Sequence, residues 1–309
     1  MSRDGIRNAS YDYARLLAVI GIIWFHAQAP GAYIGYSGLS FFVLLMMGLA
    51  LPQIAAQREQ RHRAPAFLRY AAARGRRLLV PWLVASAFYG GLKLIEVVRG
   101  ASFSAEFTKE MWVTGTALHL WFLPFAFAMT LALWPVGHWL RKAPVWVWPP
   151  LTLIFGGGAL VALAGMQVTA QPVPLAQWAY ALPAVLLGTA LALGRENIVS
   201  MMGILALFVG IALMMSWTVG LFQIGVAGIV LIFCTLIYIP PTALSGRAAR
   251  ASLWIYLIHP AVLTVVQRGG LAAAHSMMLA LITTLFCLVI VAIFETILQG
   301  RRTPGLLTS

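Results

Sequence analysis

The chain has 309 residues, of which 61% are hydrophobic and only 9% are charged, and its mean hydropathy is +0.88. A soluble domain carries about 25% charged residues, so this composition excludes a soluble enzyme and indicates a polytopic membrane protein. The net charge of +13 does not require a nucleic-acid partner, because basic residues collect on the cytoplasmic side of membrane proteins. The two cysteines lie in apolar stretches, and no Cys/His spacing predicts a metal site.

Apolar windows of about 20 residues predict an all-α integral membrane protein with about ten transmembrane helices. The predicted spans are 12–29, 36–56, 78–98, 118–140, 145–165, 176–194, 199–216, 219–239, 252–267 and 273–297. The connections between them are short, so we expect a single transmembrane domain over 1–309 without an appended soluble domain. The sequence shows no internal repeat.

The distribution of basic residues predicts which side of the membrane each loop faces. If the N-terminus is cytoplasmic, most of the 21 lysines and arginines fall in inner segments. The outer side then keeps only Lys93, Arg99, Lys109 and Arg268. This asymmetry predicts that both termini are cytoplasmic. An odd number of spans would place Arg301 and Arg302 outside and change little else.

The first span carries a cation and a titratable ring. Arg15 and His26 are eleven residues apart, which brings them to within about 20° of each other around a helix and about 16 Å apart along its axis. Hydrocarbon tolerates such groups when they face a protein interior or a wet cavity, where they usually mark function. Asp12 lies one turn before Arg15 and is expected to pair with it. The alternatives are an arginine that reaches the inner headgroups and a histidine bonded to an outer loop.

The loop before the third span carries a second basic motif. Arg74 and Arg77 are three residues apart and share a face if this segment is helical. Two guanidinium groups on one face suit a phosphate ligand, because arginine binds phosphate in a bidentate manner and stays charged. The alternative is an ordinary cytoplasmic cluster that touches anionic lipid headgroups.

Three later features complete the candidates. His119 and Trp121 open the fourth span from the outside, and the predicted topology puts His119 on the same outer side as His26, which suggests a shared chamber. Tyr256 and His259 precede a proline within the ninth span, where the proline frees a backbone carbonyl, so a structural role is favoured for His259.

Glu295 lies near the inner end of the last span. Its simplest role is to pair with an inner arginine. It is also the main acidic residue that a proton relay could use.

Taken together, these blocks resemble the membrane acyltransferase-3 family. The matching motifs are Asp12, Arg15 and His26, then Arg74 and Arg77, then His119-Leu-Trp-Phe-Leu, then Ser252-Leu-Trp-Ile-Tyr-Leu-Ile-His259-Pro260. They run in order over nearly the whole chain. The resemblance implies transfer of an acyl group, commonly acetyl, from cytoplasmic acyl-coenzyme A to a carbohydrate or lipid-linked glycan, in the inner membrane of a bacterium. Some members carry a fused extracytoplasmic esterase-like domain, and some transfer succinyl or longer groups.

The residue chemistry permits a concrete mechanism. Neutral imidazole has a pKa suited to accepting a hydroxyl proton near pH 7, so His26 is the predicted general base, with a covalent acyl-histidine as the less favoured variant. Arg15, Arg74 and Arg77 are expected to hold the phosphates of coenzyme A. The pantetheine arm would run along the stripe from Arg15 to His26. No permanently bound cofactor is expected.

On the acceptor side, His119 is expected to orient the acceptor or stabilise the oxyanion, and the neighbouring aromatic residues would exclude water. The competing interpretation is a transporter or flippase of a glycan, lipid or small anion. Such a protein would use Arg15 and His26 as ligand or proton sites. Secondary transporters often show inverted repeats with matched broken helices, and the sequence shows no convincing pair of them. A non-catalytic scaffold would leave the Arg15 and His26 stripe unexplained.

Overall fold

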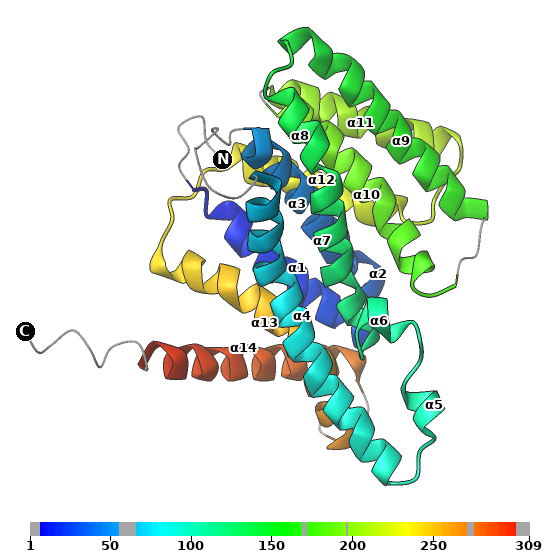
Figure 1. Cartoon of the computed structure of the whole chain (residues 1–309), viewed down its shortest axis with the longest axis vertical. Coiled ribbons are helices and arrows are strands. Elements are labelled where there is room, and N and C mark those ends of the chain that lie inside the picture. The colour runs from blue at the N-terminus through cyan, green and yellow to red at the C-terminus, as the bar shows by residue number, and fades with distance from the viewer. Residues whose placement is uncertain (1–6, 56–65, 169–171, 196, 271–274, 301–309) are drawn as a thin grey trace, which may run out of the picture. The chain divides into compact units, whose positions relative to one another are not determined.

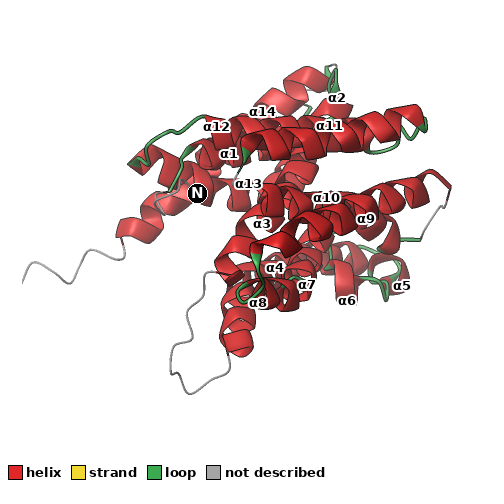
Figure 2. Ribbon diagram, turned by 90° about the horizontal axis from the view of Figure 1, so that it is seen from above, coloured by secondary structure: helices red, strands yellow, loops and turns green. Residues whose placement is uncertain are grey.

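The computed structural model describes residues 7–55, 66–168, 172–195, 197–270 and 275–300. All regular structure within these residues is helical, and no strand occurs among them (Figure 2). Figure 1 labels the α-helices, which are α1 (Ser10–His26), α2 (Ala32–Gly35), α3 (Ser37–Ala55), α4 (Ala66–Val98), α5 (Phe103–Glu106), α6 (Met111–Thr114), α7 (Phe122–Ala132), α8 (Trp134–Leu140), α9 (Trp148–Val168), α10 (Leu175–Gly194), α11 (Ile198–Met214), α12 (Leu221–Leu236), α13 (Ala243–Arg268) and α14 (Ser276–Gly300). Two short 3-10 helices, η1 (Leu118–Trp121) and η2 (Val145–Val147), precede α7 and α9. The all-α prediction is confirmed for this part of the chain.

Each of the ten predicted apolar stretches contains helix among its described residues, which does not by itself give the number of membrane crossings. Among the described residues, seven helical segments are long and apolar enough to cross a membrane. The helices α1, α11 and α12 have 17, 17 and 16 residues, which is short of the roughly 20 that a bilayer core requires. The count of ten and the cytoplasmic side of both termini therefore stay predictions. Arg301 and Arg302, which bear on that count, lie outside the described residues.

Two predicted spans differ in detail from the helices that contain them. The third predicted span, 78–98, lies within the longer helix α4, which begins at Ala66, so Arg74 and Arg77 belong to the helix itself. The fourth predicted span, 118–140, matches the candidate span Leu118–Leu140, which consists of η1, α7 and α8 with a break at Leu133. The break has a local cause, because Pro135 lacks the N–H that a continuous helix needs and fits the start of α8 instead.

The chain folds into two compact units. Unit 1 comprises residues 1–42 and 222–309, and unit 2 comprises residues 43–221. Unit 1 contains α1, α2, the beginning of α3, and α12 to α14. Unit 2 contains the rest of α3 and all the helices from α4 to α11.

In unit 1, α13 packs against both α1 and α14. One end of this group is closed by small and branched side chains at the end of α1 and α13 and at the start of α14. They are Ala27, Ala29, Leu263, Val266, Leu279 and Ala280. The direction of the three helices follows: α1 and α13 run parallel, and α14 runs antiparallel to them. The beginnings of α1 and α13 and the end of α14 therefore lie at one side of unit 1.

A buried asparagine joins α1 to α12 at that opposite end. The Asn8 side chain donates to the carbonyl oxygens of Cys234 (2.8 Å) and Ile237 (3.1 Å), which the end of α12 leaves without helical partners. Its amide oxygen accepts from the N–H groups of Ser10 and Ile239, each at 3.0 Å. One side chain thus satisfies four backbone groups from both segments.

Glycines let α1 approach the segment that follows it. A Cβ atom added at Gly21 would lie 2.7 Å from the carbonyl oxygen of Gly35, and one added at Gly38 would collide with the carbonyl oxygen of Ala18. These backbones meet without an intervening side chain. Close approach through small residues is typical of helices packed in membranes.

Unit 2 is built on three helix pairs. α9 packs along α10, α4 packs against α7, and α10 also contacts α11. Gly188 of α10 lies against Leu44 of α3, where an added Cβ would come within 3.0 Å of the Leu44 Cα. Gly137 of α8 similarly faces Ile54 of α3.

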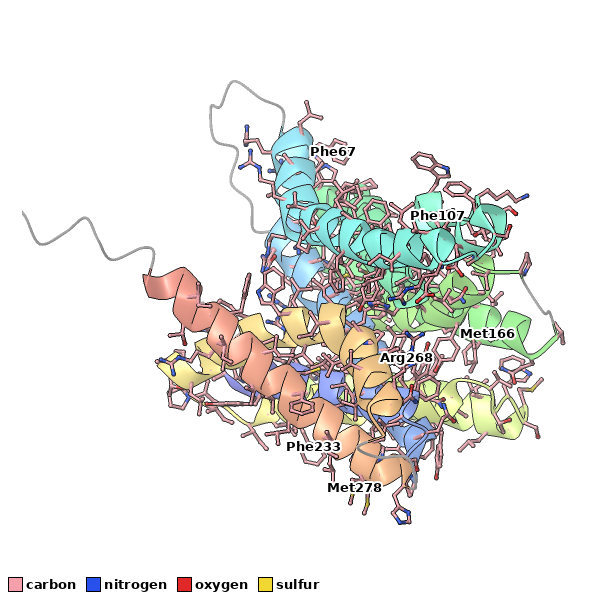
Figure 3. The ribbon with its side chains drawn as sticks, turned by 90° about the horizontal axis from the view of Figure 1, so that it is seen from below. Phe67, Phe107, Met166, Phe233, Arg268 and Met278 are labelled. Carbon is pink, nitrogen blue, oxygen red and sulfur yellow. The ribbon has the colours of Figure 1, made fainter. Side chains whose placement is uncertain are left out.

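Many large apolar side chains point outward. Phe233 of α12 and Met278 of α14 are about half exposed, at 57% and 49% (Figure 3). Val161 of α9 and Leu285 of α14 are exposed at 74% and 59%. Exposed apolar side chains in this number are unfavourable in water and favourable in lipid, and with the seven long apolar helices they indicate an integral membrane protein.

Candidate functional site

Asp12 holds two arginines at the beginning of α1. The carboxylate accepts from Arg7 through Nε (2.9 Å) and Nη2 (2.8 Å), and from Arg15 through Nη1 (3.3 Å). The Asp12 side chain is 4% exposed, while Arg7 and Arg15 are 53% and 28% exposed. The predicted pairing of Asp12 with Arg15 is confirmed. Arg7 had not been predicted here, because its spacing of five residues before Asp12 follows no helical rule.

His26 lies at the other end of α1 and is exposed. Its ring faces that of His259 on α13, with the centroids 5.2 Å apart and the planes inclined by 36°. Phe25 flanks it at 5.3 Å in an edge-to-face arrangement. The imidazole is therefore reachable from outside and is held on one side by a second histidine.

The structure explains why His259 precedes a proline. Pro260 has no N–H, so the carbonyl of Tyr256 four residues earlier loses its helical hydrogen bond. The Nδ1 of His259 donates to that carbonyl at 2.8 Å and replaces the missing donor inside a fully buried site. This structural role was predicted for His259. The bond also places the hydrogen of the neutral ring on Nδ1 and the lone pair on Nε2.

The stripe between Arg15 and His26 is closed. Val19 and Ile22, which lie on it, are 0% and 2% exposed, so neither lines an open channel. The path of a pantetheine arm along this stripe stays a prediction, and these two side chains give it no open wall. Asp12 and His26 are fourteen residues apart, or about 21 Å along the helix axis. Asp12 therefore cannot touch the ring of His26.

The two predicted arginines of unit 2 differ in their surroundings. Arg74 donates to Oε1 of Gln53 on α3 at 3.0 Å, and its guanidinium lies 5.1 Å from the ring centre of Tyr70. Arg77 is exposed, and among the described residues it forms no ion pair. Both side chains rise from α4, where a spacing of three residues places them on neighbouring positions of one face.

His119 and Trp121 lie in η1 of unit 2. The ring of His119 meets that of Tyr89 on α4 edge to face, with the centroids 5.2 Å apart. Trp121 is 4% exposed and packs against Phe125 of α7. Trp121 is thus a packing residue, whereas His119 is partly exposed.

Glu295 pairs with an arginine, as predicted. Its Oε1 accepts from Nε of Arg250 at 3.0 Å, which joins α14 to α13. Within the part of the chain that the structure describes, no group of three or more His, Cys, Asp or Glu side chains could hold a metal ion.

Comparison with protein-family models matched the acyltransferase domain over residues 8–297. The chain belongs to the acyltransferase-3 family. A search of the curated proteins and a search of the solved structures each found no match. The chain is therefore a membrane acyltransferase, and its own structure must supply the details of its site.

The acyltransferase presents two polar centres on one helix of unit 1: the arginine–aspartate cluster and the histidine pair. The contact between His26 and His259 was not predicted, because it depends on the register of α1 against α13, which no single-sequence pattern carries. The available signal was that both residues lie within predicted spans that run in the same direction through the membrane. Tyr89 beside His119 and Gln53 beside Arg74 were missed for the same reason.

Proposed function

We propose that this acyltransferase moves an acyl group, with acetyl as the expected one, from cytoplasmic acyl-coenzyme A to a hydroxyl of an extracytoplasmic or lipid-linked carbohydrate. The proposed location is the inner membrane of a bacterium. The observation that carries the proposal is the composition of α1, with a guanidinium fixed by Asp12 near one end and an exposed imidazole at the other end. An anionic donor and a neutral hydroxyl acceptor need these two different groups.

His26 is the proposed general base. Its ring nitrogen takes the proton of the acceptor hydroxyl while the oxygen attacks the thioester carbonyl. The tetrahedral intermediate then collapses, the carbon–sulfur bond breaks, and the departing thiolate of coenzyme A takes the proton back from the imidazolium. His259 supports this role because its ring packs against His26 and is itself locked to the Tyr256 carbonyl. A base held in one orientation loses less entropy on the way to the transition state.

The donor's phosphates are the proposed ligands of the arginines. Arg15 is suited to this because its carboxylate partner fixes the guanidinium while 28% of the side chain stays exposed. Arg77 is suited by exposure, and Arg74 by its rigid setting between Gln53 and Tyr70. Guanidinium groups bind phosphates in a bidentate manner at any physiological pH.

For the acceptor, we propose that His119 orients the sugar or stabilises the oxyanion. Its partial exposure supports that role, and its edge-to-face contact with the ring of Tyr89 orients the imidazole. The transporter alternative is weakened by the pairing of Glu295 with Arg250, which occupies the main residue available for a proton relay.

The test uses purified full-length protein with radiolabelled acetyl-coenzyme A, with and without glycan from the host membrane. The expected products are labelled glycan and free coenzyme A in equal amounts. The variant His26→Ala should lower the rate by about 10²–10⁴-fold, the usual contribution of a general base. His275→Ala is the matched control, because His275 is exposed just before α14 and belongs to no proposed site.

Two results would contradict the proposal separately. A wild-type rate in His26→Ala would remove His26 from the mechanism and leave the transferase intact. Label that crosses the membrane of a proteoliposome without release of coenzyme A would replace the transferase by a transporter.

A further inference from the structure

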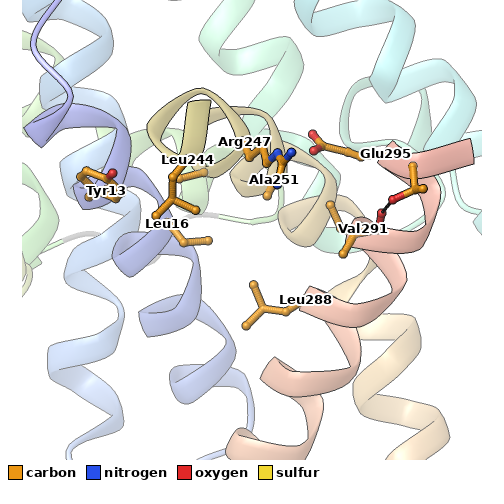
Figure 4. Close-up of a pocket in the computed structure, with 11 residues that line it drawn as sticks. Tyr13, Leu16, Leu244, Arg247, Ala251, Leu288, Val291 and Glu295 are labelled. Carbon is orange, nitrogen blue, oxygen red and sulfur yellow. Dashed lines mark hydrogen bonds between the residues drawn. The ribbon is translucent and has the colours of Figure 1, made fainter. Parts of the chain in front are cut away.

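Unit 1 contains a cavity between α1, α13 and α14 (Figure 4). Its volume is about 450 Å³, which lies within the range of about 300–1,000 Å³ that small-molecule sites occupy. It is lined by Tyr13, Leu16, Leu244, Arg247, Ala248, Ala251, Leu288, Val291, Ala292, Glu295 and Thr296. Most of this lining is aliphatic or small. A charged ligand alone would leave that surface unmatched.

The cavity follows from the uneven packing of the three helices. At the far end of the group, Ala27, Ala29 and Ala280 let the helices close against one another. At the cavity end, the facing residues include long charged side chains on α13 and α14, which do not pack as a close apolar layer. The small side chains of Ala248, Ala251 and Ala292 leave the space between the helices unfilled there.

The charges around the cavity do not cancel. Glu295 is neutralised by Arg250, which lies at 3.0 Å. Arg247 also lines the cavity, and among the described residues it forms no ion pair. Figure 4 shows Arg247 and Glu295 at one level and Leu288 farther along α14. The separation of Leu288 and Glu295 by seven residues corresponds to about 10 Å along the helix. The cavity thus has one cationic end and one apolar end.

This polarity matches an amphiphile that the surrounding membrane supplies. The cytoplasmic leaflet carries anionic phospholipids, and basic pockets between membrane helices on that side bind their headgroups. The arginine bias of the sequence predicts that the cavity end of α1, α13 and α14 is the cytoplasmic one. We propose that the cavity binds an anionic phospholipid, with its phosphate at Arg247 and one acyl chain against Leu16, Leu288 and their neighbours.

The lipid site is separate from the proposed donor residues of α1. Around the helix axis, Leu16 is turned by about 100° and Tyr13 by about 160° from Arg15. The cavity lining does not include Arg15, Asp12 or His26. The proposal is therefore independent of the acyl-transfer mechanism, and its test needs no enzymatic activity.

The experiment uses the full-length protein in nanodiscs that contain phosphatidylglycerol with a photoactivatable diazirine in its acyl chain. A phosphatidylcholine probe with the same chain is the comparison. After irradiation, peptide mass spectrometry locates the adducts. We expect adducts within 244–251 and 288–296, with a preference of about fivefold for the anionic probe, as one arginine near the headgroups provides.

Three variants sharpen the result. Arg247→Gln should abolish the anionic preference, and Ala251→Phe should reduce labelling by both probes because it fills the cavity. Arg76→Gln is the control, since Arg76 is an exposed arginine of unit 2 that does not line the cavity. Equal labelling by both probes that persists in Arg247→Gln would overturn the proposal and indicate ordinary surrounding lipid. Loss of labelling on addition of acetyl-coenzyme A would also overturn it, because the cavity would then belong to the donor.

Discussion

Substitution of Asp12 by asparagine separates the recognition of the donor from the chemistry. The change keeps the shape of the side chain and removes the charge that fixes Arg15. If Arg15 binds the donor's phosphates, the variant should raise the KM for acetyl-coenzyme A and leave kcat close to the wild-type value. An effect confined to KM follows because Asp12 lies about 21 Å along the helix from His26.

The structure sets the size of the effect. A hydrogen bond to a charged group contributes about 1.5–3 kcal/mol. The contact between Arg15 and Asp12 is 3.3 Å long and Arg15 is 28% exposed, so the lower end applies. A loss of about 1.4 kcal/mol corresponds to about a tenfold increase in KM. The larger cost of about 3–5 kcal/mol for breaking a fully buried pair does not apply, because water can reach both arginines.

Arg7→Ala is the matched control, and it is not expected to raise the KM for the donor. Arg7 takes the shorter contacts with Asp12, at 2.8 and 2.9 Å, so its removal leaves the carboxylate free to turn toward Arg15. The KM for the donor should stay constant or fall. Steady-state kinetics with varied acetyl-coenzyme A measure both variants, and thermal unfolding checks that each is folded. An equal rise of the KM in both variants would refute the reasoning. The arginine–aspartate cluster would then have only a structural role at the beginning of α1.

Two further predictions concern other parts of the chain. Arg77→Ala should raise the Kd for acetyl-coenzyme A in a calorimetric titration. Arg76→Ala, on the same exposed stretch of α4, should leave that Kd unchanged. Equal effects of the two substitutions would favour a cluster that binds lipid headgroups. Asn8→Ala should lower the free energy of unfolding by about 2 kcal/mol, because the part-buried carbonyl of Ile237 and N–H of Ile239 lose their partner. An unchanged thermal midpoint would refute the role of this link.

The sequence predicted the contacts that depend only on residues a few positions apart in the chain. The pairing of Asp12 with Arg15 follows from a spacing of three on a helix and is found at 3.3 Å. The carbonyl freed by Pro260 was also predictable, since it depends only on the missing N–H. The break at Leu133 has a cause in the sequence, which is the proline two residues later. A window that averages hydropathy does not detect it, because hydropathy carries no information about the backbone N–H that proline lacks.

What the sequence could not supply is the register between helices. Val19 and Ile22 lie on the same stripe as Arg15, and their apolar character suits both a channel wall and a packed contact. Only the neighbouring helices decide between the two, and here they bury the stripe. The cavity of unit 1 was missed for a related reason. The sequence does not distinguish Arg247 from the other basic residues, because its place in the cavity depends on the packing of α14 against α13.

The polar groups of unit 1 lie at the two ends of its packed helices. The arginine–aspartate cluster and the proposed lipid cavity lie at the end where α1 and α13 begin, while His26 and His259 lie toward the other ends. The cavity lining includes neither histidine, and Arg15 lies about 16 Å along α1 from His26. A lipid bound in the cavity would therefore not contact the proposed base directly.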